Sequence, residues 1–288
     1  MTGPDSRLKL ARPPCVLIFS GSDPSGGAGL QADITAIAAQ GAHPMSVVTV
    51  LTVQDNQHVF GVYPVAADLV RQQAQVLVDR IAIAAVKIGI VGNRANAEVI
   101  AAIIRDLRTR LPDLPVVFDP VLANGAGDTL STEDPIAALA PLFALATVIT
   151  PNRIEANRLC GVAADEDGDP DDQAKQLLAR GCQHVLLKGG HGPEQDHVLN
   201  RWYSRTQDRN QSWRWPRLPG EFHGSGCTLA AALAGLLAQG MSMEHAIAAA
   251  QTYCQQTLSS SYAIADGQRI PNRLTAMLPS TQRAKEQE

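Results

Sequence analysis

Cysteine is scarce in this 288-residue sequence, and its five copies are scattered: Cys15, Cys160, Cys182, Cys227 and Cys254. An odd number at such spacing fits neither a disulfide framework nor a zinc motif. No apolar run is long enough to span a membrane, and the first residues lack the apolar core of a secretory signal. These absences argue against a disulfide-rich secreted protein and a membrane protein, so we expect a cytoplasmic location.

Aromatic residues make up only 4% of the sequence, whereas 45% of the residues are hydrophobic. The core must therefore be built mainly from Ala, Val, Leu and Ile. The formal net charge is −4, and no basic block interrupts the folded part. Nucleic acid is therefore not expected as a partner.

Short apolar runs alternate with helical periodicity along most of the chain. The pattern predicts strands at 15–19, 45–51, 85–91, 116–118, 147–149 and 184–187, and helices at 28–40, 69–83, 95–111, 154–160 and 171–180. Such alternation predicts an α/β fold with a mostly parallel sheet covered by helices on both faces. We expect one domain at 14–279 between flexible tails at 1–13 and 280–288, since no linker divides the chain.

Two segments interrupt this rhythm. The polar stretch 193–219 carries all three tryptophans and alternates in QSWRWPRL, which predicts a hairpin beside the sheet. The acidic stretch 164–172 is typical of a solvated loop.

The most informative motif is EFHGSGCTLAAALAG at 221–235. Gly224, Ser225 and Gly226 precede an apolar helical run that Cys227 and Thr228 begin. Glycine lets backbone N–H groups approach a ligand, and a helix N-terminus adds unpaired donors and partial positive charge. This combination favours an anion site, most simply for phosphate, and the helix terminus is expected to favour ionisation of the Cys227 thiol. The alternative is a tight turn before a core helix.

Other motifs follow in order: GSDPSGGAGLQAD at 21–33, VKIG at 86–89, VVFDPV at 116–121, TPN at 150–152 and LLKGGH at 186–191. Together with residues 221–235, they resemble the hydroxymethylpyrimidine and phosphomethylpyrimidine kinases of thiamine biosynthesis, within the ribokinase-like kinases. The resemblance runs from about residue 16 to about residue 250. It implies a three-layer fold with a central sheet, ATP and Mg²⁺ as cofactors, and a small pyrimidine as the acceptor of phosphate.

The resemblance implies a phosphate site from two parts of the chain. It places the amides of Gly224, Ser225 and Gly226 on the transferred phosphate and Cys227 as acceptor of the substrate proton. Lys188 leaves a strand onto a glycine turn, where it can reach a phosphate as a flexible charge. By itself Lys188 also fits an ordinary surface lysine, and Cys227 also fits a small buried residue.

Three polar residues stand at strand ends, where the edge of a parallel sheet binds ligands. The resemblance assigns Asp119 and Glu155 to Mg²⁺, and Asn152 to ATP together with Lys188 and Thr228. Carboxylate and phosphate oxygens are the ligands that Mg²⁺ prefers. Asn152 and Glu155 fit equally well a helix cap followed by a first-turn carboxylate.

The resemblance places four residues at the acceptor: Gly21, Asp33, Gln54 and Val121. Amide and carboxylate groups can pair with the amino group and ring nitrogens of an aminopyrimidine. The spacing alone would make Asp33 a solvent-facing helix residue and Gln54 a loop residue. The glycine-rich segment at 20–29 is not a Walker motif, because no Gly-Lys-Ser/Thr follows it.

One departure from the family pattern bears on function. Family members commonly carry a lysine near the position of Gly125, and the sequence DPVLANGAGD at 119–128 has none. The missing lysine keeps a non-catalytic pyrimidine sensor as an alternative. A pyridoxal or pyridoxine kinase on the same scaffold is another, because its substrate is a similar flat heterocycle with a hydroxymethyl group. The resemblance also implies a homodimer.

Overall fold

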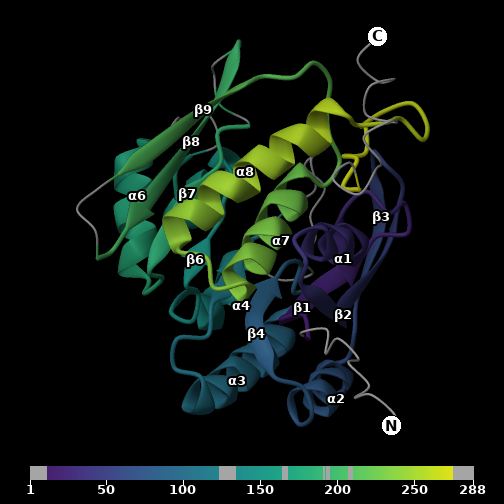
Figure 1. Ribbon diagram of the computed structural model, residues 1–288, viewed down its shortest axis with the longest axis vertical. Helices are drawn as coiled ribbons and strands as arrows, with labels where there is room; N and C mark the ends of the chain where they lie inside the picture. The colour runs from purple at the N-terminus through teal and green to yellow at the C-terminus, as the bar shows by residue number, and fades with distance from the viewer. Residues whose placement is uncertain are drawn as a thin grey trace, which may run out of the picture.

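A computed structural model describes residues 12–122, 134–163, 168–190, 192, 195–206 and 210–274. Within them one nine-stranded sheet has the order β3-β2-β1-β4-β5-β6-β7-β8-β9 (Figure 1). The strands are β1 (Cys15–Ser22), β2 (His43–Gln54), β3 (Val59–Pro64), β4 (Ile83–Ile88), β5 (Val116–Phe118), β6 (Val148–Ile149), β7 (His184–Leu187), β8 (His197–Ser204) and β9 (Gln211–Pro216). The central strands pair in parallel, in the spatial order β2-β1-β4-β5-β6-β7. Strand β3 at one end and strands β8 and β9 at the other pair antiparallel.

Helices cover both faces of the sheet, so the fold is the expected three-layer, ribokinase-like α/β sandwich. One face carries α1 (Gly29–Ala39), α7 (Ser225–Ala238) and α8 (Met243–Ser259) (Figure 1). The other face carries α2 (Ala67–Val78), α3 (Arg94–Arg110), α4 (Pro135–Phe143), α5 (Arg153–Cys160) and α6 (Pro170–Ala179).

Strand β1 shows how the sheet separates two cores. Its side chains alternate, so Leu17 and Phe19 join the core under α2–α6, while Val16 and Ile18 join the core under α1, α7 and α8. Strands buried on both faces read as continuous apolar runs. This explains why the strands of the sheet's interior were visible in the sequence.

Helix α7 lies between the sheet, α1 and α8 (Figure 1). Eleven of its fourteen residues are buried, and five of those eleven are alanine or glycine. Its small side chains let α1 and α8 approach closely. Because α7 is covered by the sheet, α1 and α8, it is apolar on all sides. Its N-terminus is thereby fixed against the edge of the sheet.

The expected hairpin is confirmed, because β8 and β9 pair antiparallel and extend the sheet. Strand β3 and helices α4 and α8 were not anticipated. The sequence around Gly125, the acidic stretch 164–167 and residues 1–11 and 275–288 lie outside the described residues. Within the described part, no helix has the length and apolar character needed to cross a membrane.

Candidate active site

A cavity of about 510 Å³ opens at the carboxyl ends of the parallel strands. It is lined by residues at or just after the carboxyl ends of β1, β2, β4, β5, β6 and β7, and by the N-terminus of α7. The glycine-rich and polar motifs stand at these strand ends because the buried strands themselves are apolar. The edge of the sheet therefore gathers chemistry from segments that lie far apart in the sequence.

The segment from Gly224 to Cys227, here called the anion loop, forms one wall of the cavity. Gly224 is the N-cap of α7 with φ of 78°, a left-handed conformation that favours glycine. No side chain caps the helix. The first-turn N–H groups of Ser225, Gly226 and Cys227 are therefore directed towards the cavity side, where an anion can accept them.

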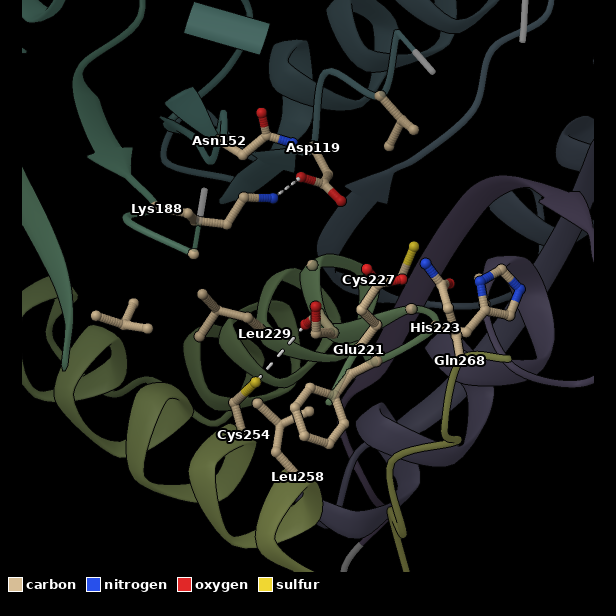
Figure 2. Close-up of a pocket in the computed structure, with 18 of the residues that line it drawn as sticks. Asp119, Asn152, Lys188, Glu221, His223, Cys227, Leu229, Cys254, Leu258 and Gln268 are labelled. Atoms are coloured by element: carbon tan, nitrogen blue, oxygen red, sulfur yellow. Dashed lines mark hydrogen bonds and ion pairs between the residues drawn. The ribbon is translucent and has the colours of Figure 1, made fainter. Parts of the chain in front are cut away.

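Lys188 faces the anion loop from the end of β7 (Figure 2). Its Nζ donates to Asp119 Oδ1 at 2.8 Å, and Thr150 Oγ1 donates to the same oxygen at 2.8 Å. Burial would raise the pKa of Asp119, but Lys188 and Lys87 outweigh burial and lower it. Burial likewise disfavours the charge of Lys188, yet Asp119 and Glu155 raise its pKa. The site thus holds an ionised pair ready for a phosphate or a cation.

Gly226 makes room for this pair. A Cβ at that position would lie 2.9 Å from Lys188 Nζ and 3.8 Å from Asp119 Oδ2. Gly226 has no positive φ, so its backbone does not require glycine. The missing side chain serves the approach of the lysine to the anion loop.

Glu155 and Asn152 form a capping box at the start of α5. Glu155 N–H donates to Asn152 Oδ1 at 2.9 Å, and Asn152 N–H donates to Glu155 Oε2 at 2.7 Å. Burial raises the pKa of Glu155 to about 7, although Lys188 opposes the shift. Both residues also line the cavity. The cap and the cavity position, which the sequence left as alternatives, are both realised.

The carboxylates suit a magnesium ion that also binds substrate oxygens. Asp119 Oδ2 has no protein hydrogen bond within the described residues, and Glu155 lines the same cavity. Those residues hold no cluster of three or more carboxylate, histidine or cysteine ligands. Two carboxylates with water and phosphate oxygens are a normal donor set for Mg²⁺.

Cys227 lines the cavity, but the expectation that its thiol ionises readily is wrong for this structure. Burial raises the pKa of Cys227 to about 11, although nearby Lys87 and the N–H of Gly29 lower it. Desolvation of the thiolate therefore outweighs the groups that favour it. At neutral pH the group is a thiol.

Gln54, Gly21 and Val121 line the cavity, as their expected contact with an acceptor requires. Gln54 is the last residue of β2 and is partly exposed. Thr52 and Ile90 stand beside them in the lining.

Asp33 and Thr228 do not reach the cavity. Asp33 is fully buried and accepts from Lys87 Nζ at 2.7 Å, so contact with an acceptor would require this ion pair to open. Thr228 is also fully buried, and its Oγ1 donates to Gly224 O at 2.8 Å. Neither side chain is solvent-facing, because α1 and α7 pack against each other and the sheet.

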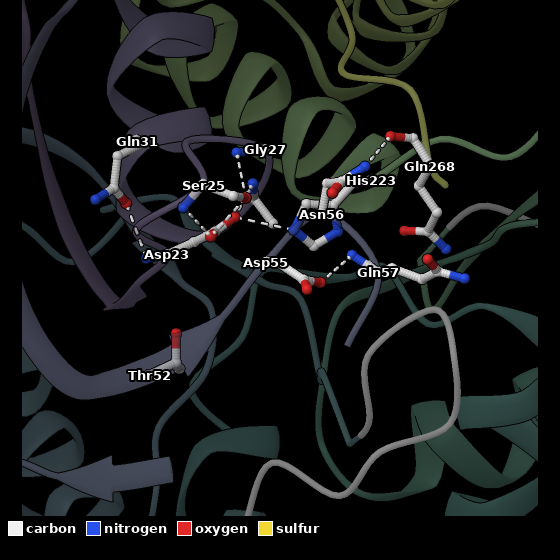
Figure 3. Close-up of polar contacts among 12 residues, drawn as sticks. Asp23, Ser25, Gly27, Gln31, Thr52, Asp55, Asn56, Gln57, His223 and Gln268 are labelled. Carbon is white, nitrogen blue, oxygen red and sulfur yellow. Dashed lines mark hydrogen bonds and ion pairs between the residues drawn. The ribbon is translucent and has the colours of Figure 1, made fainter. Parts of the chain in front are cut away.

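Sequence reasoning missed the role of Asp23 (Figure 3). Its Oδ1 accepts from Ser25 N–H and Oγ, and its Oδ2 accepts from Ala28 N–H and bonds His223 Nε2 at 2.9 Å. Burial would raise the pKa of Asp23, but His223 and Ser25 outweigh it and lower the pKa. The Asp-Pro-Ser-Gly sequence was a visible turn signal. The pairing with His223, 200 residues later, had no local signal.

The other end of the cavity is more apolar. Leu229, Leu258 and Cys254 lie together there, away from Lys188 (Figure 2). Trp215 Nε1 donates to Gln251 Oε1 at 3.0 Å, which fixes the tryptophan of β9 against α8. Apolar walls with a few fixed polar groups suit a flat heterocycle.

Known proteins resemble this chain in sequence. A family model described as phosphomethylpyrimidine kinase matches residues 23–272. A hydroxymethylpyrimidine/phosphomethylpyrimidine kinase of Streptomyces coelicolor is 36% identical over 260 residues, covering 88% of this chain and 92% of that protein. A probable thiamine biosynthetic bifunctional enzyme of Oryza sativa subsp. japonica is 34% identical over 250 residues, covering 86% of this chain and 45% of that protein.

Solved structures share the fold. An ADP complex of Bacillus subtilis pyridoxal kinase superposes with a TM-score of 0.80 at 28% identity, covering 93% of this chain and 100% of that one.

Proposed function

The chain belongs to the phosphomethylpyrimidine kinase family, and on that premise we propose that it phosphorylates 4-amino-5-hydroxymethyl-2-methylpyrimidine and then its monophosphate with ATP, in thiamine biosynthesis. The observation that carries the proposal is the convergence of Lys188, Asp119 and the anion loop on one cavity whose other lining includes Gln54. Phosphoryl transfer depends mainly on positioning and on stabilising charge on the phosphate. This cavity supplies both.

Each part of the cavity has a role in that reaction. The acceptor oxygen forms a bond to the γ-phosphorus of ATP as the bond to the β-phosphate oxygen breaks, and ADP leaves. The amides of the anion loop and Lys188 stabilise the charge on the transferred group. Asp119 and Glu155 would hold Mg²⁺, which supplies charge neutralisation between the phosphates. Asn152 fixes the carboxylate of Glu155 through the capping box.

Only the thiolate form of Cys227, which lines the cavity beside the anion loop, would take the proton of the acceptor hydroxyl. A thiol whose pKa is raised to about 11 is rarely ionised at neutral pH. A loose transition state needs little proton removal before the phosphorus–oxygen bond breaks. The proton therefore leaves late, to the small thiolate fraction of Cys227. The amides of the anion loop contribute more to the rate than proton removal does.

Gln54 supports the pyrimidine over pyridoxal as the acceptor. Its amide offers a donor and an acceptor together, which match the ring nitrogen and amino group of an aminopyrimidine. Pyridoxal kinase is the second candidate, because the fold superposes well on that of the Bacillus subtilis enzyme. We also propose that the protein is cytoplasmic. We further propose that it forms a homodimer, and light scattering on the purified protein tests this oligomeric state.

A coupled assay that measures ADP release tests the function. Purified protein with ATP and Mg²⁺ should turn over the hydroxymethylpyrimidine and its monophosphate faster than pyridoxal. Gln54→Met should lower kcat/KM for the pyrimidine more than for pyridoxal, because only the former uses both sides of the amide. Faster turnover of pyridoxal by the wild type would favour the second candidate.

A further inference from the structure

Arg273 occupies an unusual place for a cation. It is 5% exposed and lies against the N-terminus of α7, where the helix dipole is positive. Its guanidinium forms no ion pair within the described residues. A buried, unpaired cation at that end of a helix is costly unless something nearby compensates for it.

The compensation comes from oxygens on both sides of the anion loop. Arg273 Nε donates to Thr228 Oγ1 at 2.8 Å, and Nη2 donates to Gly224 O at 3.5 Å. Nη2 also donates to Gly27 O in the glycine-rich loop after β1. Thr228 Oγ1 itself donates to Gly224 O at 2.8 Å. One side chain thus fixes the helix cap to the loop on the acceptor side.

The packing shows how close these loops are. A Cβ on Gly224 would lie 2.1 Å from Gly27 O and 2.9 Å from Arg273 Nη2. The backbone of Arg273 is itself held, since its carbonyl accepts from Tyr253 Oη at 2.8 Å. The guanidinium therefore has little freedom to leave the loops.

We propose that Arg273 is a positioning residue for phosphoryl transfer. It holds Gly224 in its left-handed conformation, keeps the anion loop against the acceptor loop, and places a fixed positive charge behind the amides that receive the phosphate. Its oxygen partners do not neutralise that charge, so an anion in the loop is stabilised by it. The proposal rests on the proposed function in one respect: the anion loop receives the transferred phosphate.

Arg273→Gln tests the proposal, with Arg273→Lys as the conservative variant. We expect Arg273→Gln to lower kcat roughly tenfold or more, approaching the loss from removing a direct oxyanion donor, while KM for ATP stays within about threefold. Arg273→Lys should recover part of the loss, because it restores the charge without the planar fork. Arg269→Gln is the matched control: Arg269 lies in the same segment, but its guanidinium bonds Ser261 and not the anion loop.

A binding measurement separates positioning from general loss of stability. ADP with aluminium fluoride and Mg²⁺ mimics the phosphate during transfer, and ADP alone does not. Calorimetry should show that Arg273→Gln loses affinity for the fluoride complex by about the same factor as kcat, with ADP affinity unchanged. If Arg273→Gln does not fold, Thr228→Val removes one bond to the guanidinium together with the bond from Thr228 to Gly224 O, and it should show a smaller loss of the same kind.

The outcomes are distinct. Wild-type kcat in Arg273→Gln, equal losses for ADP and the fluoride complex, or an equal loss in Arg269→Gln would each overturn the proposal. Failure of the wild type with every acceptor would contradict only the proposed function, because the fluoride-complex comparison needs no acceptor. Failure of the wild type to bind that complex would overturn the role of the anion loop and of Arg273 with it.

Discussion

Gly226→Ala should separate catalysis from stability. The added Cβ would stand 2.9 Å from Lys188 Nζ, closer than ordinary contact, so the end of the lysine must move. The 2.8 Å bond to Asp119 would then lengthen, and so would the proposed contact of the ammonium with phosphate. The loss of one charge-assisted interaction costs about 1.5–3 kcal/mol. Turnover should therefore fall roughly 10-fold to 100-fold.

The thermal stability of Gly226→Ala, unlike its turnover, should not fall. Gly226 lies in the first turn of α7 without a positive φ, and alanine is favoured over glycine in helices by about 0.5–1 kcal/mol. The Tm should stay level or rise slightly. Gly224→Ala is the contrasting variant, since φ of 78° and a Cβ 2.1 Å from Gly27 O strain the backbone itself. It should lower the Tm.

The assay combines ADP release with thermal unfolding followed by circular dichroism. Wild-type kcat in Gly226→Ala, together with an unchanged Tm, would refute the argument that Lys188 needs the empty space at Gly226. A Tm loss in Gly226→Ala as large as in Gly224→Ala would refute the assignment of their different roles.

Three other variants test the site. Because the pKa of Glu155 is raised to about 7, a proton on Glu155 competes with Mg²⁺ below that pH. Half-maximal activity should therefore need about tenfold more Mg²⁺ at pH 6 than at pH 8. An equal Mg²⁺ requirement at the two pH values would refute this competition. The folded protein binds this proton more tightly than the unfolded chain, so the stabilisation that the proton gives below pH 4.5 is lost as pH rises through 7. Glu155→Gln should therefore unfold at a higher temperature than the wild type at pH 8 but not at pH 5. Lys188→Ala and Glu155→Gln should lower kcat more than acceptor affinity, measured by calorimetry, and wild-type turnover in both would mean that the phosphate lies elsewhere. Cys227→Ser should lower turnover while the fold stays intact. In the wild type, the rate of alkylation of Cys227, followed by peptide mass spectrometry, should still rise between pH 9 and pH 10, as the raised pKa requires. An alkylation rate that reaches its plateau below pH 8 would contradict that pKa.

The sequence revealed those parts of the fold that depend on local pattern. Buried parallel strands are continuous apolar runs, and the caps Asn152 and Glu155 act within one helical turn. Strand β3 was missed because it is an edge strand with exposed apolar residues, including Phe60 and Tyr63 at 70% and 59% exposure. Its alternation has no buried side to mark it.

The candidate site divides in the same way. Lys188, Asp119 and the anion loop stood out because glycines and strand ends accompany them. Asp33 looked like a ligand contact, but it lies on α1 and forms a buried ion pair with Lys87 on β4. The pKa of Cys227 depends on how much chain covers the thiol, which no short motif records. Residues joined by packing across the fold leave no periodic signal.

The bond from Arg273 to Gly27 also has a consequence for synthesis of the protein. Its two residues are 246 positions apart. At about 5–20 residues per second, Gly27 is made roughly 10–50 s before the side chain that holds its loop. During that interval the glycine-rich loop and the start of α7 lack their common anchor. Binding of substrate by a nascent chain should therefore begin only after residue 273 has emerged from the ribosome.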